Sequence, residues 1–288
     1  MAKRKPKEYK VTSLGEFAKQ IELLLPNGTA EGNWYRGIGR SSTYTLRPGL
    51  FRHPKMSLEI VDYIRLEARM LEDFERFSIL HTESMDTGAA SLDGGLRKLF
   101  FMQHYGIPTR LLDWSSNPFI ALYFALSTAH FGAGGAAPTE DAAVWIIDPT
   151  AWNKVALSHA GHGDNGPLAH NDAVPGYGPR RLFSGEFEPT ALKTLNVQAA
   201  CILGVTNSAR MFAQRGVFTI FGSNLLSMEE QFGSGGFDVG TLNKIVIPAS
   251  QISILLNSII KMGYTDSVSY PDLHGLAMEI KRSRGFTV

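Results

Sequence analysis

Residues 117–126 read NPFIALYFAL, and this stretch decides the fold. Asn117 suits the N-cap of a helix, and Pro118 suits the first helical position, where a missing backbone N–H costs nothing. The residues that follow are apolar on nearly every side of the predicted helix. A helix without a polar face must be covered all round, so we expect it at the centre of the fold.

The segments around this helix indicate an α+β protein. The further helices are predicted at residues 13–24, 58–77, 92–105, 250–262 and 272–282. The strands are predicted at residues 33–38, 143–147, 201–205, 217–221 and 244–247. Because helices dominate the first half and strands the second, we expect a helix-rich N-terminal half packed on a mixed or antiparallel sheet from the C-terminal half.

We expect one domain over residues 1–288, with an N-terminal helix inside residues 1–30. Residues 157–181 form a long stretch without periodicity that is rich in glycine, proline and polar residues. Long irregular loops are often functional, so a role as a lid over a site stays open.

Composition bounds the class of protein. The 28 Lys and Arg residues nearly balance the 27 Asp and Glu residues, which gives a formal charge of +1. This balance argues against an extended nucleic-acid cradle but is compatible with a local basic groove. The lone Cys201 lies in an apolar run and is interpreted as a buried hydrophobic residue. With neither a signal peptide nor an apolar stretch that spans a bilayer, we expect a soluble cytoplasmic protein without a membrane partner.

The densest polar segment is residues 103–117, QHYGIPTRLLDWSSN, which we interpret as a tight connection between two helices. Ser115, Ser116 and the free N–H groups of the next helix would form an anion site. Arg110 would add a bidentate clamp for a phosphate or carboxylate. Two other interpretations stay open: Arg110 forms an internal salt bridge with Asp113, and the hydroxyl groups only cap the helix.

Arg36 is the second candidate. It lies in the predicted strand NWYRGI, between aromatic residues and Gly37. A planar guanidinium beside aromatic rings commonly holds phosphates and rings, and a glycine permits close approach of a ligand or of another backbone. The alternative is that Arg36 lies on a solvated strand edge.

Several motifs together resemble the FRG domain family, which is found in bacteria and their mobile elements and is named for an aromatic-Arg-Gly triplet. Here the triplet is Tyr35-Arg36-Gly37, with Tyr35 in place of the usual phenylalanine. The other matching segments are residues 46–52, 103–118, 121–125, 210, 214–218 and 270–276. The resemblance therefore extends from about Tyr35 to Lys281.

The motif order of this family is similar to that of ADP-ribosyltransferases, which implies NAD as a substrate and allows a split sheet of their kind. By this analogy Arg36 holds the NAD phosphates, and residues 114–116 with Ala121 and Phe124 form the second motif. At the third motif, where a glutamate is expected, the chain has Gln214. Glu229 and Glu230 in the following loop would be substitutes, or His104 and Tyr105 would act instead.

These considerations give two sets of candidate residues. The catalytic candidates are Arg36, His104, Tyr105, Ser115 and Gln214. The cofactor-binding candidates are Tyr35, Arg36, Gly37, Arg47, Thr109, Arg110, Asp113, Trp114, Ser115 and Asn117. No metal site is predicted, because the spacing of His159, His162 and His170 fits no helix face and no cysteine or glutamate lies near them.

The resemblance implies an NAD-dependent, ADP-ribosyltransferase-like bacterial effector, a toxin or antiphage defence protein. Its acceptor would be RNA, DNA or protein, and an antitoxin or chaperone would be a further partner. The alternatives are a non-catalytic module that binds a nucleotide or nucleic acid, and a scaffold in which the polar residues only tie the loop together.

Overall fold

The computed structural model describes residues 4–26, 32–54, 59–78, 94–132, 136–162, 166–169, 176–182, 185, 187, 192–204 and 208–286. Parts of the predicted loop 157–181, including His170, lie outside the described residues. None of the helices formed by the described residues has the length and hydrophobicity needed to cross a bilayer.

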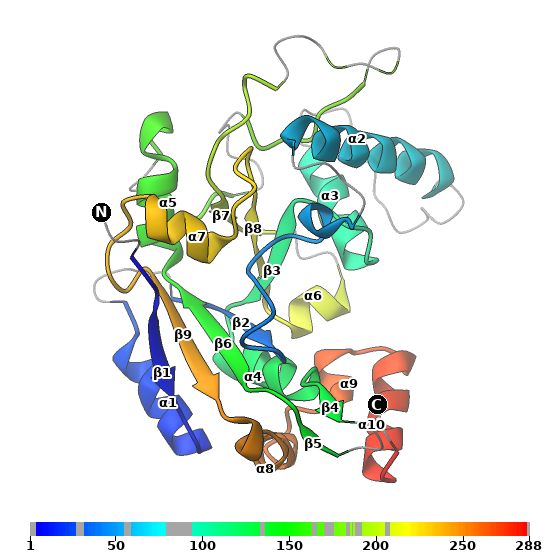
Figure 1. Cartoon of the computed structure of the whole chain (residues 1–288). Helices are drawn as coiled ribbons and strands as arrows, with labels where there is room; N and C mark the ends of the chain where they lie inside the picture. Colours follow the sequence, from blue (N-terminus) through cyan, green and yellow to red (C-terminus); the bar gives the residue numbers. More distant parts are fainter. Residues whose placement is uncertain are drawn as a thin grey trace.

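Helices and strands alternate irregularly along the described chain (Figure 1). The strands are β1 Lys7–Lys10, β2 Trp34–Ile38, β3 Leu111–Ser115, β4 Phe131–Gly132, β5 Ala136–Pro138, β6 Ala142–Ile147, β7 Ala200–Ile202, β8 Gly216–Ile220 and β9 Leu242–Ile247. The α-helices are α1 Leu14–Leu23, α2 Ile60–Phe77, α3 Gly94–His104, α4 Pro118–Ser127, α5 Pro149–Ala156, α6 Ala209–Ala213, α7 Met228–Ser234, α8 Ala249–Lys261, α9 Asp266–Ser269 and α10 Leu273–Ser283. Short 3-10 helices lie at Leu50–Arg52 and Ser158–Ala160.

Seven strands form one mixed sheet in the order β1-β9-β6-β2-β3-β8-β7. Only β1 and β9 pair in parallel, and the other neighbours are antiparallel. The predicted α+β class with a mixed sheet is therefore confirmed. The sheet also takes β1, β2 and β3 from the first half of the chain, so its strands do not come from the C-terminal half alone.

The prediction that residues 103–117 form a connection without a strand is wrong, because β3 lies inside this segment at the centre of the sheet. Leu111, Leu112 and Trp114 are all buried, so apolar residues occur at neighbouring positions and not in alternation. A strand covered on both faces lacks the alternating pattern by which strands are usually recognised.

The sheet consists of two well-paired blocks that meet at a weak junction. β2 shares a five-pair register with β6, and β3 shares a five-pair register with β8. Between β2 and β3, in contrast, the register holds the single pair Tyr35↔Ser115. This pair lies near the start of β2 and at the end of β3, so the two strands diverge beyond it, along residues 36–38 and 111–114. The sheet nevertheless remains continuous, and the split sheet of the ADP-ribosyltransferase kind is not confirmed.

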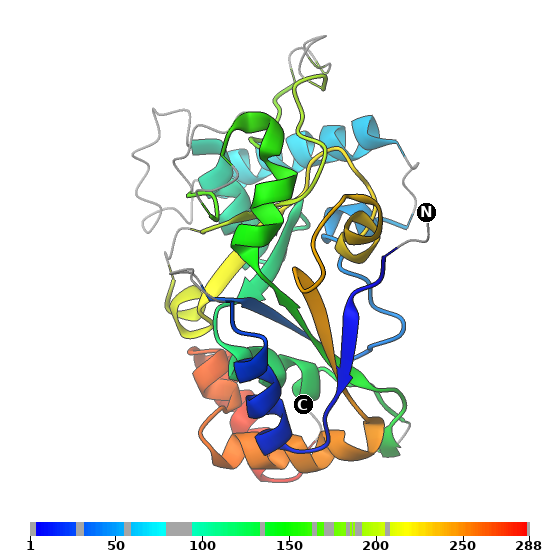
Figure 2. The ribbon, with the colours of Figure 1, turned by 90° about the vertical axis from the view of Figure 1, so that its left-hand side faces the viewer.

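Two hydrophobic cores flank the sheet. Helices α1, α4 and α8 pack on one face of the β1-β9-β6-β2 block (Figures 1 and 2). Residues of α2, α3, α5 and α7 join the other core, which includes β3, β8 and β7. The predicted central helix is confirmed as α4: Asn117 caps it, and six of its residues are buried.

Gly37 and Gly39 let α4 lie directly against β2. A Cβ atom at Gly37 would overlap the carbonyl oxygen of Ala121, and one at Gly39 would overlap that of Thr128. Of the two uses proposed for Gly37, close approach of another backbone is therefore the one that the packing requires.

Arg110 forms a fully buried ion pair with Glu67 of α2. Its Nε lies 3.0 Å from Glu67 Oε2, and its terminal nitrogens donate to the carbonyls of Phe221 at 2.8 Å and Tyr177 at 3.0 Å. The suggested Arg110–Asp113 salt bridge is thus wrong. The pair joins α2 to the start of β3 and to the end of β8.

We expect Glu67→Gln to lower the free energy of unfolding by about 3–5 kcal/mol, because it leaves the buried Arg110 charge unpaired. Urea unfolding followed by circular dichroism measures the change. Glu72→Gln, at an exposed position of the same helix, is the matched control and should unfold like the wild type. Equal stability of the two variants would show that the pair does not hold α2 to β3.

Gly37→Ala should destabilise the protein by about 1–3 kcal/mol or more, because the added methyl group overlaps the α4 backbone. Thermal unfolding without any ligand tests this. Gly15→Ala in α1, where a Cβ meets no atom within 4 Å, should be neutral or stabilising. A Gly37→Ala protein as stable as the wild type would contradict the packing role.

Candidate functional site

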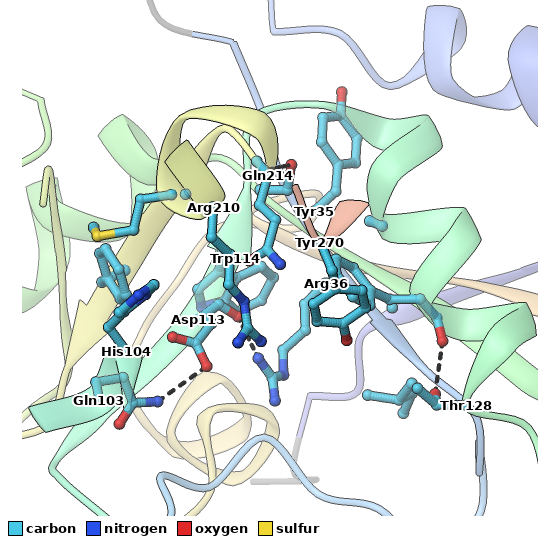
Figure 3. Close-up of a pocket in the computed structure, with 18 of the residues that line it drawn as sticks. Tyr35, Arg36, Gln103, His104, Asp113, Trp114, Thr128, Arg210, Gln214 and Tyr270 are labelled. Atoms are coloured by element: carbon cyan, nitrogen blue, oxygen red, sulfur yellow. Dashed lines mark hydrogen bonds between the residues drawn. The ribbon is translucent and has the colours of Figure 1, made fainter. Parts of the chain in front are cut away.

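A cavity of about 620 Å³ opens where β2 and β3 diverge. Its walls come from β2, β3 and β8, from the ends of α3 and α6, from α4, and from Tyr270 (Figure 3). Among the predicted site residues, those that line it are Tyr35, Arg36, Gly37, His104, Asp113, Trp114, Ser115 and Gln214. Arg40 and Tyr44 also line the cavity, although no sequence motif marks them, and Arg210 and Tyr270 come from the later segments that resemble the family.

Arg36 crosses the gap between the two strands. Its Nη1 donates to the backbone carbonyl of Asp113 on β3, and its Nη2 lies 3.4 Å from the Tyr44 hydroxyl. Its Nε is buried and has no acceptor among the described residues. A guanidinium carries five N–H donors, so these contacts leave donors over for a ligand in the cavity.

Asp113 is the only carboxylate among the described residues that line the cavity. Its Oδ2 accepts a hydrogen bond of 3.0 Å from Gln103 Nε2, as Figure 3 shows. Gln103 Oε1 in turn accepts one of 2.7 Å from the hydroxyl of Thr109, which is fully buried. Thr109 therefore lies outside the cavity and fixes the orientation of Gln103 and, through it, of Asp113.

Arg210 and His104 face the same space from α6 and α3 (Figure 3). The Arg210 guanidinium lies 4.7 Å from the centroid of the Tyr270 ring. Burial lowers the pKa of His104 from its ordinary value of 6.5, and the Arg210 charge lowers it further, against the opposing charges of Asp113 and Asp272. His104 is consequently neutral at pH 7.

Ser115 and Gln214 tie the walls of the cavity together. The Ser115 hydroxyl donates to the Gln214 carbonyl at 2.7 Å and accepts from the Asn117 N–H at 3.0 Å. The Gln214 side-chain amide donates to the Ser269 carbonyl at 3.0 Å, next to Tyr270. Through these hydrogen bonds the two side chains fix the positions of β3, α6 and α9 relative to each other.

The predicted anion site at the start of α4 is already capped. The Asn117 side chain accepts from the N–H groups of Phe119 at 2.9 Å and Ile120 at 3.3 Å. Because these N–H groups are satisfied within the chain, helix capping accounts for Asn117.

Tyr35 and Trp114 line the cavity but are core residues. The Tyr35 ring points away from Arg36 in Figure 3 and belongs to the core around α4, where burial raises its pKa to about 12. The Trp114 indole donates to the Thr219 hydroxyl at 3.1 Å and is buried.

The structure places the other candidates away from the cavity. Arg47 donates to the Leu225 carbonyl at 3.0 and 2.6 Å, Arg110 is buried against Glu67, and Tyr105 is 67% exposed outside the lining. The carboxylate of Glu229 accepts from the Leu46 N–H, and that of Glu230 closes a capping box with Ser227. Neither glutamate supplies a carboxylate to the cavity.

The described residues contain no cluster of three or more His, Cys, Asp or Glu side chains that could hold a metal ion. The His159 Nε2 lies 2.7 Å from the Asn196 side-chain oxygen, and His170 is outside the described residues.

One family model matches part of the chain. Residues 31–132 match the model of the FRG domain, which supports the resemblance to that family. The matched range contains β2, α2, α3, β3 and α4, and therefore Arg36, His104 and Asp113, whereas Arg210, Gln214 and Tyr270 lie beyond it. No curated protein and no solved structure matches the chain. The motif order similar to ADP-ribosyltransferases is not confirmed.

The His104 pKa should respond in opposite directions to its two charged neighbours. Arg210→Ala removes a positive charge and should raise it, whereas Asp113→Asn removes a negative charge and should lower it further. Proton NMR titration of the imidazole, assigned with a His104→Gln variant, measures both shifts. Shifts in the same direction would contradict this electrostatic arrangement.

The lowered pKa of His104 also makes the free energy of unfolding depend on pH. Because the folded state holds its proton less tightly than the unfolded state, the His104 contribution is complete above pH 6.5 and is lost as the pH falls through the lowered folded pKa. Replacing Arg210 by alanine should make this loss smaller.

Proposed function

We propose that the cavity binds NAD as a substrate and that the protein transfers ADP-ribose to a macromolecule, as a bacterial toxin or antiphage effector. The observation that carries the proposal is the convergence of Arg36 and Arg210 with the carboxylate of Asp113 at the gap between β2 and β3. The volume of about 620 Å³ lies within the range that ligand pockets commonly have.

The two arginines suit the diphosphate of NAD. Guanidinium groups bind phosphate oxygens through paired N–H donors and stack on aromatic faces at the same time. Arg36 lies 5.9 Å from the Tyr44 ring centroid, and Arg210 lies 4.7 Å from that of Tyr270. The aromatic rings beside them would take up the adenine or nicotinamide rings.

In the transfer, the bond between the ribose C1′ and the nicotinamide nitrogen breaks, and its electron pair leaves with nicotinamide. An oxygen or nitrogen of the acceptor forms the new bond to C1′ and loses a proton. Positive charge develops on the ribose, which a nearby carboxylate stabilises. We assign this role to Asp113, and we assign neutral His104 as the base that takes the acceptor's proton.

A second function, nucleotide binding without transfer, is favoured by Gln214. In the resemblance to ADP-ribosyltransferases this residue stands where a catalytic glutamate is expected, yet its amide is bound to the Ser269 carbonyl. If Asp113 does not replace the glutamate, the same cavity is a binding site only. An antitoxin or chaperone is expected as partner of a toxin and is part of the first proposal alone.

Incubation of the protein with labelled NAD and cell lysate tests the proposal. The wild type should release nicotinamide and label a macromolecule. Asp113→Asn should keep NAD binding but lower transfer by about 10²–10³-fold, because it removes charge stabilisation that matters only in the transition state. Arg36→Ala should lose both binding and transfer.

The control is Arg69→Ala, which removes an exposed arginine of α2 outside the cavity and should behave like the wild type. NAD binding is followed by thermal shift, because a ligand of the folded state raises the apparent stability. Binding without nicotinamide release in the wild type would favour the binding module, and no shift with NAD, AMP or ADP-ribose would favour a scaffold.

A further inference from the structure

Two exposed aromatic side chains stand beside the cavity. Tyr105 directly follows His104, is 67% exposed and meets its ring edge-on, with the centroids 4.9 Å apart. Phe212 directly follows the cavity residue Met211 on α6 and is 62% exposed. Single exposed aromatics are ordinary. These two flank the wall that carries His104 and Arg210, and neither belongs to the cavity lining itself.

Arginines stack on the aromatic rings in and around the cavity. Arg215 lies 5.3 Å from the centroid of Phe212, and Arg210 lies 4.7 Å from that of Tyr270. Arg52 lies 4.7 Å from the centroid of Tyr44, which also lines the cavity, and donates to the Tyr44 hydroxyl. Alternation of flat rings with guanidinium groups is the arrangement by which proteins hold successive bases and phosphates of a single strand.

The charge around the cavity is locally basic, although the whole chain carries only +1. Among the described residues that line the cavity, Arg36, Arg40 and Arg210 stand against one carboxylate, that of Asp113. Arg52 and Arg215 are exposed next to it and add two positive charges. Glu140 lies 3.8 Å from Arg40, and the charge of Asp272 acts on His104, but the five arginines still outnumber these two carboxylates and Asp113. This is the local basic groove that the composition permits.

We infer that the macromolecular acceptor is single-stranded nucleic acid. The exposed arginines would contact its phosphates, and Phe212 and Tyr105 would stack on bases that flank the modified nucleotide. This inference rests on the proposed function: an acceptor atom on a base would reach the cavity only after that base has left its stack. A single strand presents such a base without the cost of unpairing.

The test is fluorescence anisotropy with labelled single-stranded RNA and single-stranded DNA of about ten nucleotides. The wild type should bind at least one of them, and Phe212→Ala and Tyr105→Ala should each weaken binding about tenfold, since each removes one stacking platform. Raising the salt from about 50 to about 200 mM should weaken binding by the wild type about tenfold, because phosphate contacts are lost.

Phe77→Ala is the matched control. Phe77 is 63% exposed on α2, carries Arg76 at 5.1 Å from its ring, and lies outside the cavity lining, so its removal should not change binding. Unfolding midpoints equal to that of the wild type verify that all three variants are folded. Equal binding by all three variants overturns the inference, as does preference for duplex DNA or for an acidic peptide over both single strands.

NAD binding by the same wild-type sample separates this inference from the proposed function. A protein that releases nicotinamide from NAD but binds neither single strand overturns the inference alone. A protein that binds a strand through Phe212 and Tyr105 but does not bind NAD overturns the proposed function and leaves the nucleic-acid face supported.

Discussion

The hydrogen bond from Arg36 to the Asp113 carbonyl spans the place where the central sheet comes apart. β2 and β3 share one register pair, so the backbone groups of β3 that face β2 lose their partners beyond it. Buried backbone groups must find a partner elsewhere, and a side chain of β2 provides one here. An arginine suits this position because it is long enough to cross the gap and still has donors left for a ligand.

The rest of the site depends on this gap. α4 is pressed against β2 through Gly37 and Gly39, which keeps the strand on the side of the β1-β9-β6-β2 block. The buried pair of Arg110 and Glu67 holds the start of β3 on the other side. The two strands are thus fixed by different neighbours, and the cavity lies between two blocks of one sheet. Groups held on strands in this way are positioned more precisely than groups on free loops.

Local sequence patterns could predict the elements but only part of the site. Asn117 and Pro118 predict the start of α4, because a helix cap is a local signal. Arg36 is recognised as a candidate because a charged residue among the aromatic residues of a strand is unusual. β3 was missed because a short strand with both faces covered does not alternate. The partner of Arg110 was missed because Glu67 lies 43 residues away, and a spacing of that length carries no geometric information.

The position of Asp113 was also beyond the sequence, because its meaning comes from the strand that contains it. When residues 103–117 are interpreted as a loop, Asp113 is predicted to contact a ligand or to pair with Arg110. Within β3, Asp113 is the one exposed residue. Its backbone carbonyl accepts the hydrogen bond from Arg36. The structure gives Tyr105 and Gln214, in contrast, contacts that the prediction of catalytic roles did not include. The first is exposed outside the cavity lining, and the side chain of the second donates to the Ser269 carbonyl of α9.

The Nε of Arg36, which has no acceptor among the described residues, bears on why this arrangement persists. A buried donor without an acceptor costs about 1–3 kcal/mol, and an apolar side chain at this position of β2 would avoid that cost. Selection for stability alone would therefore disfavour the arginine. Residues that lower the stability of the fold are expected at functional sites, where binding of a ligand offsets the lost stability. The same reasoning applies to the polar groups around Asp113, which come from β3, from α3 and from the segment between them. Asp113, Gln103 and Thr109 form a chain of hydrogen bonds that orients the Asp113 carboxylate, so this anion and the Arg36 cation line the cavity from the two blocks of the sheet.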